Sequence, residues 1–142
     1  MVNKDVIRRK THYIEANQDK LAYLSKLTSQ EFSEDFRNIE AAKHLLQVSI
    51  EAMLDIANHI IARNRWGIPT KSSDSIRILR EKGYFSQQEE ALFGNMIKFR
   101  NRVVHLYHDI NDKEIYKILQ ENLQDFSLFL KAIAKNNFNN TD

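Results

Sequence analysis

The sequence contains no cysteine, one proline and three glycines among its 142 residues. The lack of cysteine excludes disulfides and thiolate metal sites, and it suits a reducing cytoplasm. So few prolines and glycines leave few places for tight turns, while residues that favour helix fill long stretches. We therefore expect an all-α fold and, from the length, a single domain over residues 1–142.

Long apolar runs and a large excess of one charge are also missing. Charged or amide side chains interrupt every hydrophobic stretch before the ~20 residues that span a bilayer, and no secretory signal is expected. These absences favour a soluble, cytoplasmic protein with no membrane association. Because 21 basic residues face 19 acidic ones, any nucleic-acid site must be local. Basic charge gathers mid-chain, where Arg63, Arg65 and Lys71 are candidate RNA contacts.

Apolar side chains recur at helical spacing in five segments, which we expect to form an up-and-down helical bundle. The expected helices lie over residues 3–28, from an N-cap at Ser33 to about Asn64, over about 74–82, from Ser86 into residues 99–110, and from Asn111 through Ile133. Ser86 with Glu89 makes a capping box, and Asn111 is a typical N-cap. The tail at 136–142 is expected to fray.

The second expected helix has an unusually wide apolar surface. Its main stripe consists of Ile39, Ala42, Leu46, Ile50, Met53, Ala57 and Ile60, and Leu45, Val48, Leu54 and Ile61 widen it. Either the helix is the well-covered centre of the bundle, or part of this surface mediates self-association.

The stretch FRNRVVHLYHDI, residues 99–110, concentrates polar chemistry. On a regular helix Asn101 lies above His105, whereas Arg100 is displaced from His105 by ~140° and shares a face with Tyr107. One helix therefore does not gather all four groups. The helix would have to unwind near His108, or a two-fold axis would have to bring two copies of the stretch together.

Imidazole, guanidinium and amide groups together suit cleavage of RNA by its own 2′-hydroxyl. Imidazole would move a proton, guanidinium would neutralise charge growing on phosphorus, and no metal is required. The alternative is an ordinary helix end, in which Arg100 and Arg102 are solvated, His105 is a cap and Tyr107 packs half-buried.

The segment from Arg100 to Tyr107 resembles the Arg-x4-His-x-Tyr signature of the HepT toxins, a minimal branch of the HEPN domains. Residues 54–83 are similar to the segment that this family carries before its motif. The similarity extends from about residue 35 to about residue 130.

This resemblance implies a homodimer in which two motifs meet in an interface cleft and act as a metal-independent ribonuclease on mRNA or tRNA. Arg100 and His105 would be catalytic, and Asn101 would support them. It also implies an antitoxin of the minimal nucleotidyltransferase (MNT) type that transfers AMP to Tyr107, whose added phosphates would block the cationic cleft. Arg102 would be a further cation for RNA or a solvated side chain.

Three other expectations concern partners and ligands. A non-catalytic nucleotide-binding or adaptor module that accompanies a nucleotidyltransferase is the alternative function. Glu51, Asp55 and His59 form a ladder on the second helix that could bind a metal, but we favour Asp55 pairing with His59 or reaching the motif's arginines across the dimer cleft. No glycine-rich phosphate loop occurs, which counts against ATP binding by this chain itself, and we expect no cofactor. We also expect no metal, because the ladder lacks a paired ligand set with known spacing.

Overall fold

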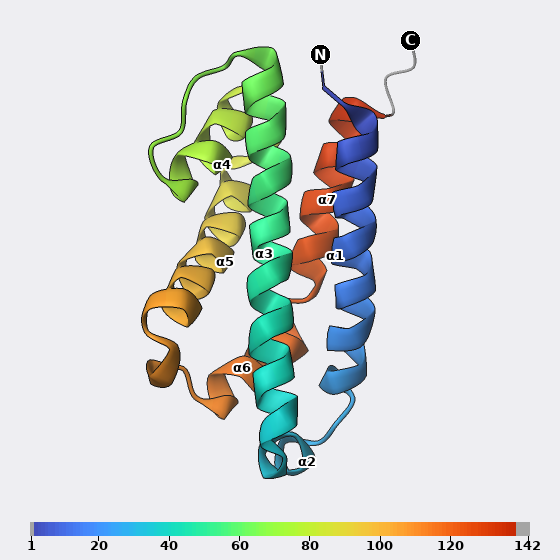
Figure 1. The fold of residues 1–142 in the computed structure, drawn as a ribbon, viewed down its shortest axis with the longest axis vertical. Coiled ribbons are helices and arrows are strands. Elements are labelled where there is room, and N and C mark those ends of the chain that lie inside the picture. The colour runs from blue at the N-terminus through green and yellow to red at the C-terminus, as the bar shows by residue number, and fades with distance from the viewer. Residues whose placement is uncertain (1, 139–142) are drawn as a thin grey trace.

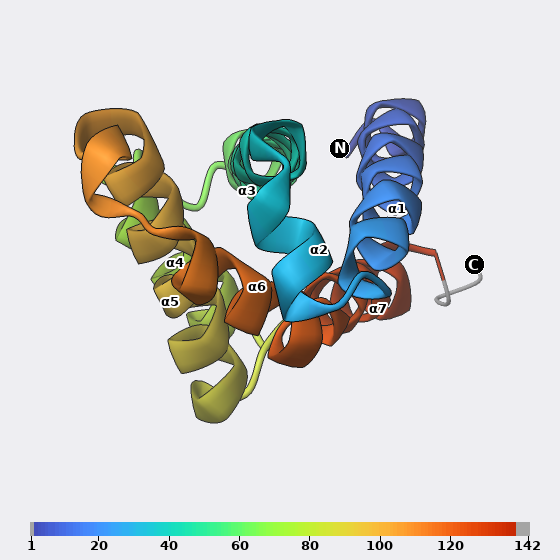
Figure 2. The same cartoon turned by 90° about the horizontal axis from the view of Figure 1, so that it is seen from below.

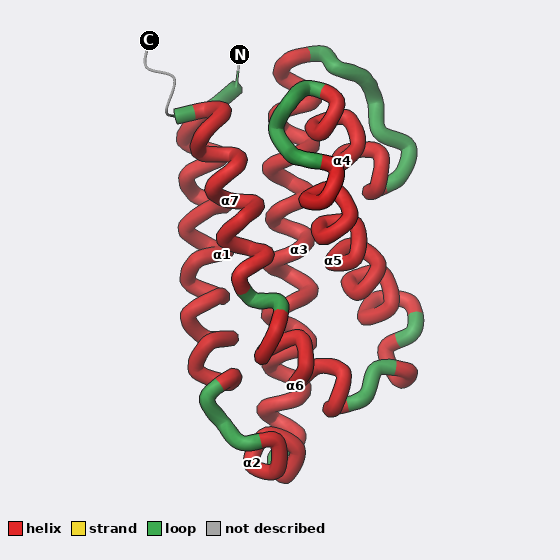
Figure 3. Tube along the Cα trace, turned by 180° about the vertical axis from the view of Figure 1, so that it is seen from behind, coloured by secondary structure: helices red, strands yellow, loops and turns green. Residues whose placement is uncertain are grey.

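A computed structural model describes residues 2–138 of the chain, and within this part every regular element is a helix (Figure 3). The elements are α1 (Lys4–Ser25), α2 (Ser29–Glu34), α3 (Phe36–Asn64), α4 (Ser72–Glu81), α5 (Gln87–His105), the 3-10 helix η1 (Tyr107–Asp109), α6 (Asp112–Glu121) and α7 (Gln124–Asn137). The all-α prediction is confirmed.

Helix α3 is the centre of the molecule. It runs between α1 on one side and α4 and α5 on the other, while α2 and α6 cross near its N-terminal end (Figures 1 and 2). The predicted stripe is buried from Ala42 to Ile60, and so are Leu54 and Ile61, while Ile39, Leu45 and Val48 are only partly buried. Most of the wide apolar surface therefore serves a central core helix, as the first alternative required.

Aromatic packing joins α5 to α7 on the other side of the core. The rings of Phe93 and Phe129 meet edge to face at 5.4 Å, and Phe85 lies 4.9 Å from Phe93. Phe93 and Phe129 are fully buried. Such offset aromatic contacts add directional attraction to the hydrophobic burial.

A short helix that the sequence pattern had not suggested precedes α3. The side chain of Thr28 accepts a hydrogen bond from the backbone of Glu31, whose carboxylate accepts one from Thr28 in return, so this capping box begins α2. Ser33 lies inside α2, and Asp35 is the N-cap of α3. The prediction of Ser33 as an N-cap was wrong, because Phe32 is drawn into the core and extends the first turn into a helix.

The last predicted helix is two helices. The chain breaks at Asn122, and α7 then turns back along α1, where Gln18 donates a hydrogen bond to the carbonyl of Leu123. The predicted N-cap Asn111 is confirmed, since its side chain accepts from the backbone of Glu114 at 2.9 Å. Helix α7 continues to Asn137, so the expected fraying does not begin at residue 136, and residues 139–142 lie outside the described part.

Among the described helices, α3 alone is long and apolar enough to cross a membrane by length and composition. More than half of its most apolar stretch is buried against the other helices, which is the pattern of a core helix.

Candidate active site

The motif predicted from sequence occupies the end of α5 and the turn after it. Helix α5 stays regular to His105, and Leu106 then leaves helical geometry with φ −132° and ψ 46°. The next residues form η1, and the chain turns Tyr107 toward α3. The helix therefore does unwind, which was one of the two alternatives considered from the sequence. It does so at Leu106, two residues before His108.

Arg100 is held by a carboxylate from α3. Its Nε and Nη2 atoms lie 3.0 and 2.9 Å from Oε2 of Glu51, and Gln47 donates a third hydrogen bond to the same oxygen at 3.1 Å. Nη1 of Arg100 donates to Oδ1 of Asn101 at 3.1 Å. The guanidinium is thus oriented from both sides while a quarter of the side chain, 26%, stays exposed to a ligand. Asn101 supports Arg100 directly.

Asp55, the carboxylate expected to serve this purpose, does something else within the chain. It pairs with Lys10 on α1 at 3.1 Å, and Nε2 of His59 accepts a hydrogen bond from the backbone of Asn3 at 3.0 Å. The expected pair of Asp55 with His59 is therefore wrong, and Glu51, one turn earlier, is the residue that contacts an arginine of the motif. The three members of the ladder have separate partners, and no group of three His, Asp or Glu side chains in residues 2–138 is arranged to hold a metal ion.

Tyr107 lies against the N-terminal half of α3. Its hydroxyl donates to the carboxylate of Glu40, and the ammonium group of Lys43 sits 4.1 Å from the centre of its ring. Lys43 is 6% exposed, so the aromatic ring takes the place of much of its hydration. The hydroxyl end of Tyr107 remains on the exposed side of α3.

The partners of the motif share one face of α3. Glu40, Lys43, Gln47 and Glu51 follow one another at intervals of three and four residues, which places them on a single stripe. Sequence reasoning missed Glu40, Lys43 and the role of Glu51. The signal was present, because polar residues at this spacing interrupt an otherwise apolar helix.

His105 is exposed, and its imidazole makes no hydrogen bond or ion pair within residues 2–138. Because α5 is regular between them, Arg100 and His105 lie ~140° apart around its axis. A single chain therefore presents the two groups on different faces, and the unwinding at Leu106 moves only Tyr107.

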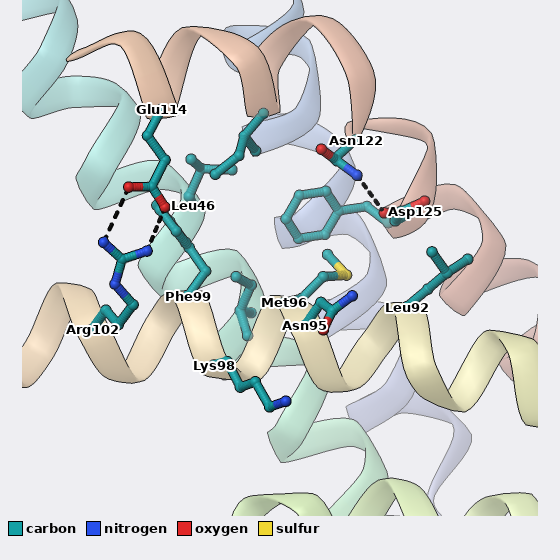
Figure 4. Close-up of a pocket in the computed structure, with 13 residues that line it drawn as sticks. Leu46, Leu92, Asn95, Met96, Lys98, Phe99, Arg102, Glu114, Asn122 and Asp125 are labelled. Atoms are coloured by element: carbon teal, nitrogen blue, oxygen red, sulfur yellow. Dashed lines mark hydrogen bonds and ion pairs between the residues drawn. The ribbon is translucent and has the colours of Figure 1, made fainter. Parts of the chain in front are cut away.

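Arg102 points away from this stripe, toward α6. It makes a two-pronged ion pair with Glu114, in which Nη2 lies 3.1 Å from Oε1, and this hydrogen bonding raises the pKa of Arg102 above its usual range (Figure 4). The pair closes one end of a cavity of about 450 Å³ between α3, α5, α6 and α7, whose floor includes Phe99 and Met96. Arg102 thus ties α5 to α6, which neither of its two predicted roles anticipated.

The remaining candidate cations lie at the opposite end of α3. Arg65 is the C-cap of α3 with φ 58°, Arg63 is in its last turn and Lys71 is the N-cap of α4. Along the helix axis, Arg65 is ~20 Å from Glu51 at 1.5 Å per residue. Within one chain the structure does not bring these cations to the motif.

Comparison with known proteins identifies relatives of this chain. The family model described as ribonuclease HepT-like matches residues 13–133. The mRNA nuclease HepT of Shewanella oneidensis is 33% identical over 103 residues, which cover 72% of this chain and 77% of that protein. The tRNA nuclease HepT of Aphanizomenon flos-aquae is 24% identical over 131 residues, which cover 90% of this chain and 87% of that protein.

Solved structures share the fold. The tri-AMPylated HEPN toxin of Shewanella oneidensis, in complex with its MNT antitoxin, superposes with a TM-score of 0.85 at 29% identity, over 92% of this chain and 98% of that one. YutE of Bacillus subtilis, a cytosolic protein of unknown function, has the same fold with a TM-score of 0.77 at 21% identity, over 99% and 96% of the two chains. The family match over residues 13–133, with the motif from Arg100 to Tyr107 inside it, shows that this chain belongs to the ribonuclease HepT-like family.

Proposed function

We propose that this chain is the toxin of a toxin–antitoxin pair and a metal-independent endoribonuclease of the cytoplasm. One observation carries the proposal: a member of the ribonuclease HepT-like family keeps Arg100, His105 and Tyr107 in place, with Arg100 oriented by Glu51 and His105 unengaged. Two relatives are named as nucleases of mRNA and of tRNA, so RNA is the substrate class that we assign.

The chemistry that these groups support is attack of a ribose 2′-hydroxyl on the adjacent phosphorus. The 2′-oxygen forms a new bond to phosphorus while the bond to the 5′-oxygen breaks, which leaves a cyclic phosphate and a 5′-hydroxyl. Imidazole of His105 moves the proton in this exchange, and the guanidinium of Arg100 neutralises charge on the phosphoryl oxygens. Asn101 keeps the guanidinium in position through its own hydrogen bond.

We place the complete site at the interface of a homodimer. Arg100 and His105 lie on different faces of one α5, so one chain does not bring them together. A two-fold axis near the motif would place the motif of a second chain opposite the first, so that the two chains together complete the site. The exposed side chains of Val104 and Leu106 flank His105 and provide apolar surface for such a contact.

We further propose that an MNT-type nucleotidyltransferase neutralises this chain by adding AMP to Tyr107. The related toxin from Shewanella oneidensis is described as tri-AMPylated and in complex with an MNT antitoxin. The hydroxyl of Tyr107 lies at the surface, and within residues 2–138 it is bound only to the exposed Glu40, so a second enzyme can reach it. Adenylyl phosphates there would lie beside the cations of the motif and exclude RNA phosphates from them.

The test is cleavage of total RNA and of transfer RNA in the presence of EDTA, by protein produced without an antitoxin. Wild type is compared at matched concentration with His105→Ala and with His44→Ala, which removes another exposed imidazole. We expect cleavage by wild type and His44→Ala but not by His105→Ala. Intact RNA with all three proteins would contradict the ribonuclease, and nucleotide binding by titration calorimetry would then support an adaptor.

A further inference from the structure

An open groove of about 460 Å³ runs between α1 and α3, which lie side by side in Figure 1. It is lined by Arg9, Lys10 and Tyr13 from α1 and by Val48, Glu51, Ala52 and Asp55 from α3. None of the α1 residues belongs to the motif, and the α1 side of this groove has no role in the proposed chemistry.

The groove is connected to the motif through one side chain. Glu51 lines the groove and also holds Arg100, with Oε2 of Glu51 2.9 Å from Nη2 of Arg100. A ligand in the groove therefore lies beside the pair that orients the proposed catalytic arginine. This continuity makes the groove an extension of the active site across the outer face of α3.

Two cations and two carboxylates line the groove, and one of the cations, Arg9, is left without a carboxylate partner among the described residues. Each carboxylate that lines it already has a cationic partner, because Glu51 binds Arg100 and Asp55 binds Lys10 at 3.1 Å. Arg9 is exposed and makes no ion pair within residues 2–138. Its guanidinium is the group that stays available for an anion.

An aromatic ring stands next to this free cation. Tyr13 is 46% exposed, and it follows Arg9 by four residues, so the two side chains share one face of α1. An unpaired cation beside an exposed aromatic ring offers the two contacts that proteins use for single-stranded nucleic acid, in which phosphates meet the cation and bases stack on the ring.

We propose that the α1–α3 groove binds the single-stranded RNA that flanks the cleaved bond, with one unpaired base stacked on Tyr13 and a phosphate held by Arg9. This inference rests on the proposed ribonuclease function and extends it, because it assigns the substrate's path to a surface that includes neither Arg63 nor Lys71. Stacking on Tyr13 needs an unpaired base, so the groove selects single strands over duplexes.

Helix α1 supplies matched control variants. Arg8 neighbours Arg9 but points elsewhere: it pairs with Asp5 of α1 at 3.3 Å, and its guanidinium lies 4.9 Å from the ring of Phe138 at the end of α7. Tyr23 is 71% exposed on the same helix and does not line the groove. Arg8→Gln and Tyr23→Ala therefore make the same chemical changes as Arg9→Gln and Tyr13→Ala outside the groove.

The experiment measures binding of a fluorescent single-stranded RNA by anisotropy, with every variant built on full-length His105→Ala so that the RNA stays intact. We expect Arg9→Gln to weaken binding about tenfold and to flatten the plot of log affinity against log salt by about 0.7. Tyr13→Ala should weaken binding roughly fivefold to 100-fold, and Tyr13→Phe, which keeps the ring, should restore it. Binding of a duplex should not respond to Tyr13→Ala.

Equal binding by the groove variants and their controls would contradict the proposal that the groove binds RNA, even if wild type cleaves RNA in a manner that depends on His105. Loss of binding in Arg8→Gln and Tyr23→Ala to the same extent would overturn it too. If wild type shows no cleavage, and RNA binding still depends on Arg9 and Tyr13, the groove proposal stands and the ribonuclease proposal fails. Circular dichroism of each variant keeps misfolding from imitating a loss of binding.

Discussion

Glu51 shows how a single residue prepares the motif. A charged hydrogen bond from Arg100 to this carboxylate is shorter and stronger than one between neutral groups, and Gln47 fixes the carboxylate in turn. The guanidinium thus loses little freedom when a phosphate arrives, which is the advantage of an arrangement made before the substrate binds.

Replacing Glu51 by Gln should therefore lower kcat by about 10-fold to 100-fold, because the guanidinium of Arg100 would no longer be held in its correct position. KM should not rise, because the substitution also removes a negative charge beside the RNA. The matched control is Glu90→Gln, which breaks a comparable half-buried pair with Arg80 at 2.7 Å far from the motif. A rise in KM with unchanged kcat would mean that Glu51 contacts the substrate instead of positioning Arg100.

The protonation of His59 affects a hydrogen bond at the start of α1. Burial is the main cause that lowers its pKa below 6.5, and the positive charge of Arg63 adds to it. The neutral imidazole accepts a hydrogen bond from the backbone of Asn3, which is the N-cap of α1.

We expect the unfolding midpoint in denaturant to fall as the pH drops below about 6.5, because the unfolded chain then binds a proton that the folded chain resists. The stability is present above the pKa of the unfolded chain and is lost as the pH falls through the lower pKa of the folded one. His59→Gln keeps an acceptor but does not titrate, so its midpoint should be flatter across this window. Identical pH profiles would show that His59 does not carry the effect.

At the scale of helices, local sequence signals set some helix boundaries and tertiary packing set others. The capping boxes and N-caps at Ser86 and Asn111 act within four residues, and both were predictable from sequence. The break between α6 and α7 at Asn122 was not, because apolar spacing continues through it and only the turn of α7 back along α1 explains it. Likewise, α2 exists because Phe32 reaches the core.

Asn111 gives an element-level prediction, since its cap begins the helix that follows the motif. Asn111→Ala should lower the free energy of unfolding by about 1 kcal/mol, because the backbone N–H of Glu114 loses its partner. Asn111→Ser, which can still accept that hydrogen bond, should stay close to wild type. Urea denaturation followed by circular dichroism measures both, and equal losses in the two variants would exclude the cap as the cause.

At the scale of the whole molecule, the bundle explains why the motif looks incomplete in one chain. Helix α3 packs on α1, α4 and α5, and α7 also contacts α5, so neighbouring helices hold α5 in one orientation. In that orientation Arg100 faces α3, while His105 is exposed at the end of α5. A homodimer resolves this separation in the function that we propose.

Mixing two versions of the protein tests that dimer. When inactive His105→Ala is added in excess to a fixed amount of wild type and subunits are allowed to exchange, cleavage should fall well below that of wild type alone, because most wild-type chains then sit in mixed dimers with a damaged shared cleft. Adding the same excess of His44→Ala should not reduce cleavage. Activity that stays constant with the His105 variant would show that each chain carries a complete site.

The sequence by itself determined the helical class, most of the core and the residues of the motif. Helical periodicity and caps act over a few neighbouring residues, and the motif lies within eight consecutive positions, so both are readable along the chain. Only the tertiary structure decided that Glu51 and Glu40 contact the motif and that Arg63, Arg65 and Lys71 lie far from it. The reason is physical: Glu51 and Arg100 are 49 positions apart, Glu40 and Tyr107 are 67 apart, and helix packing alone sets which faces meet.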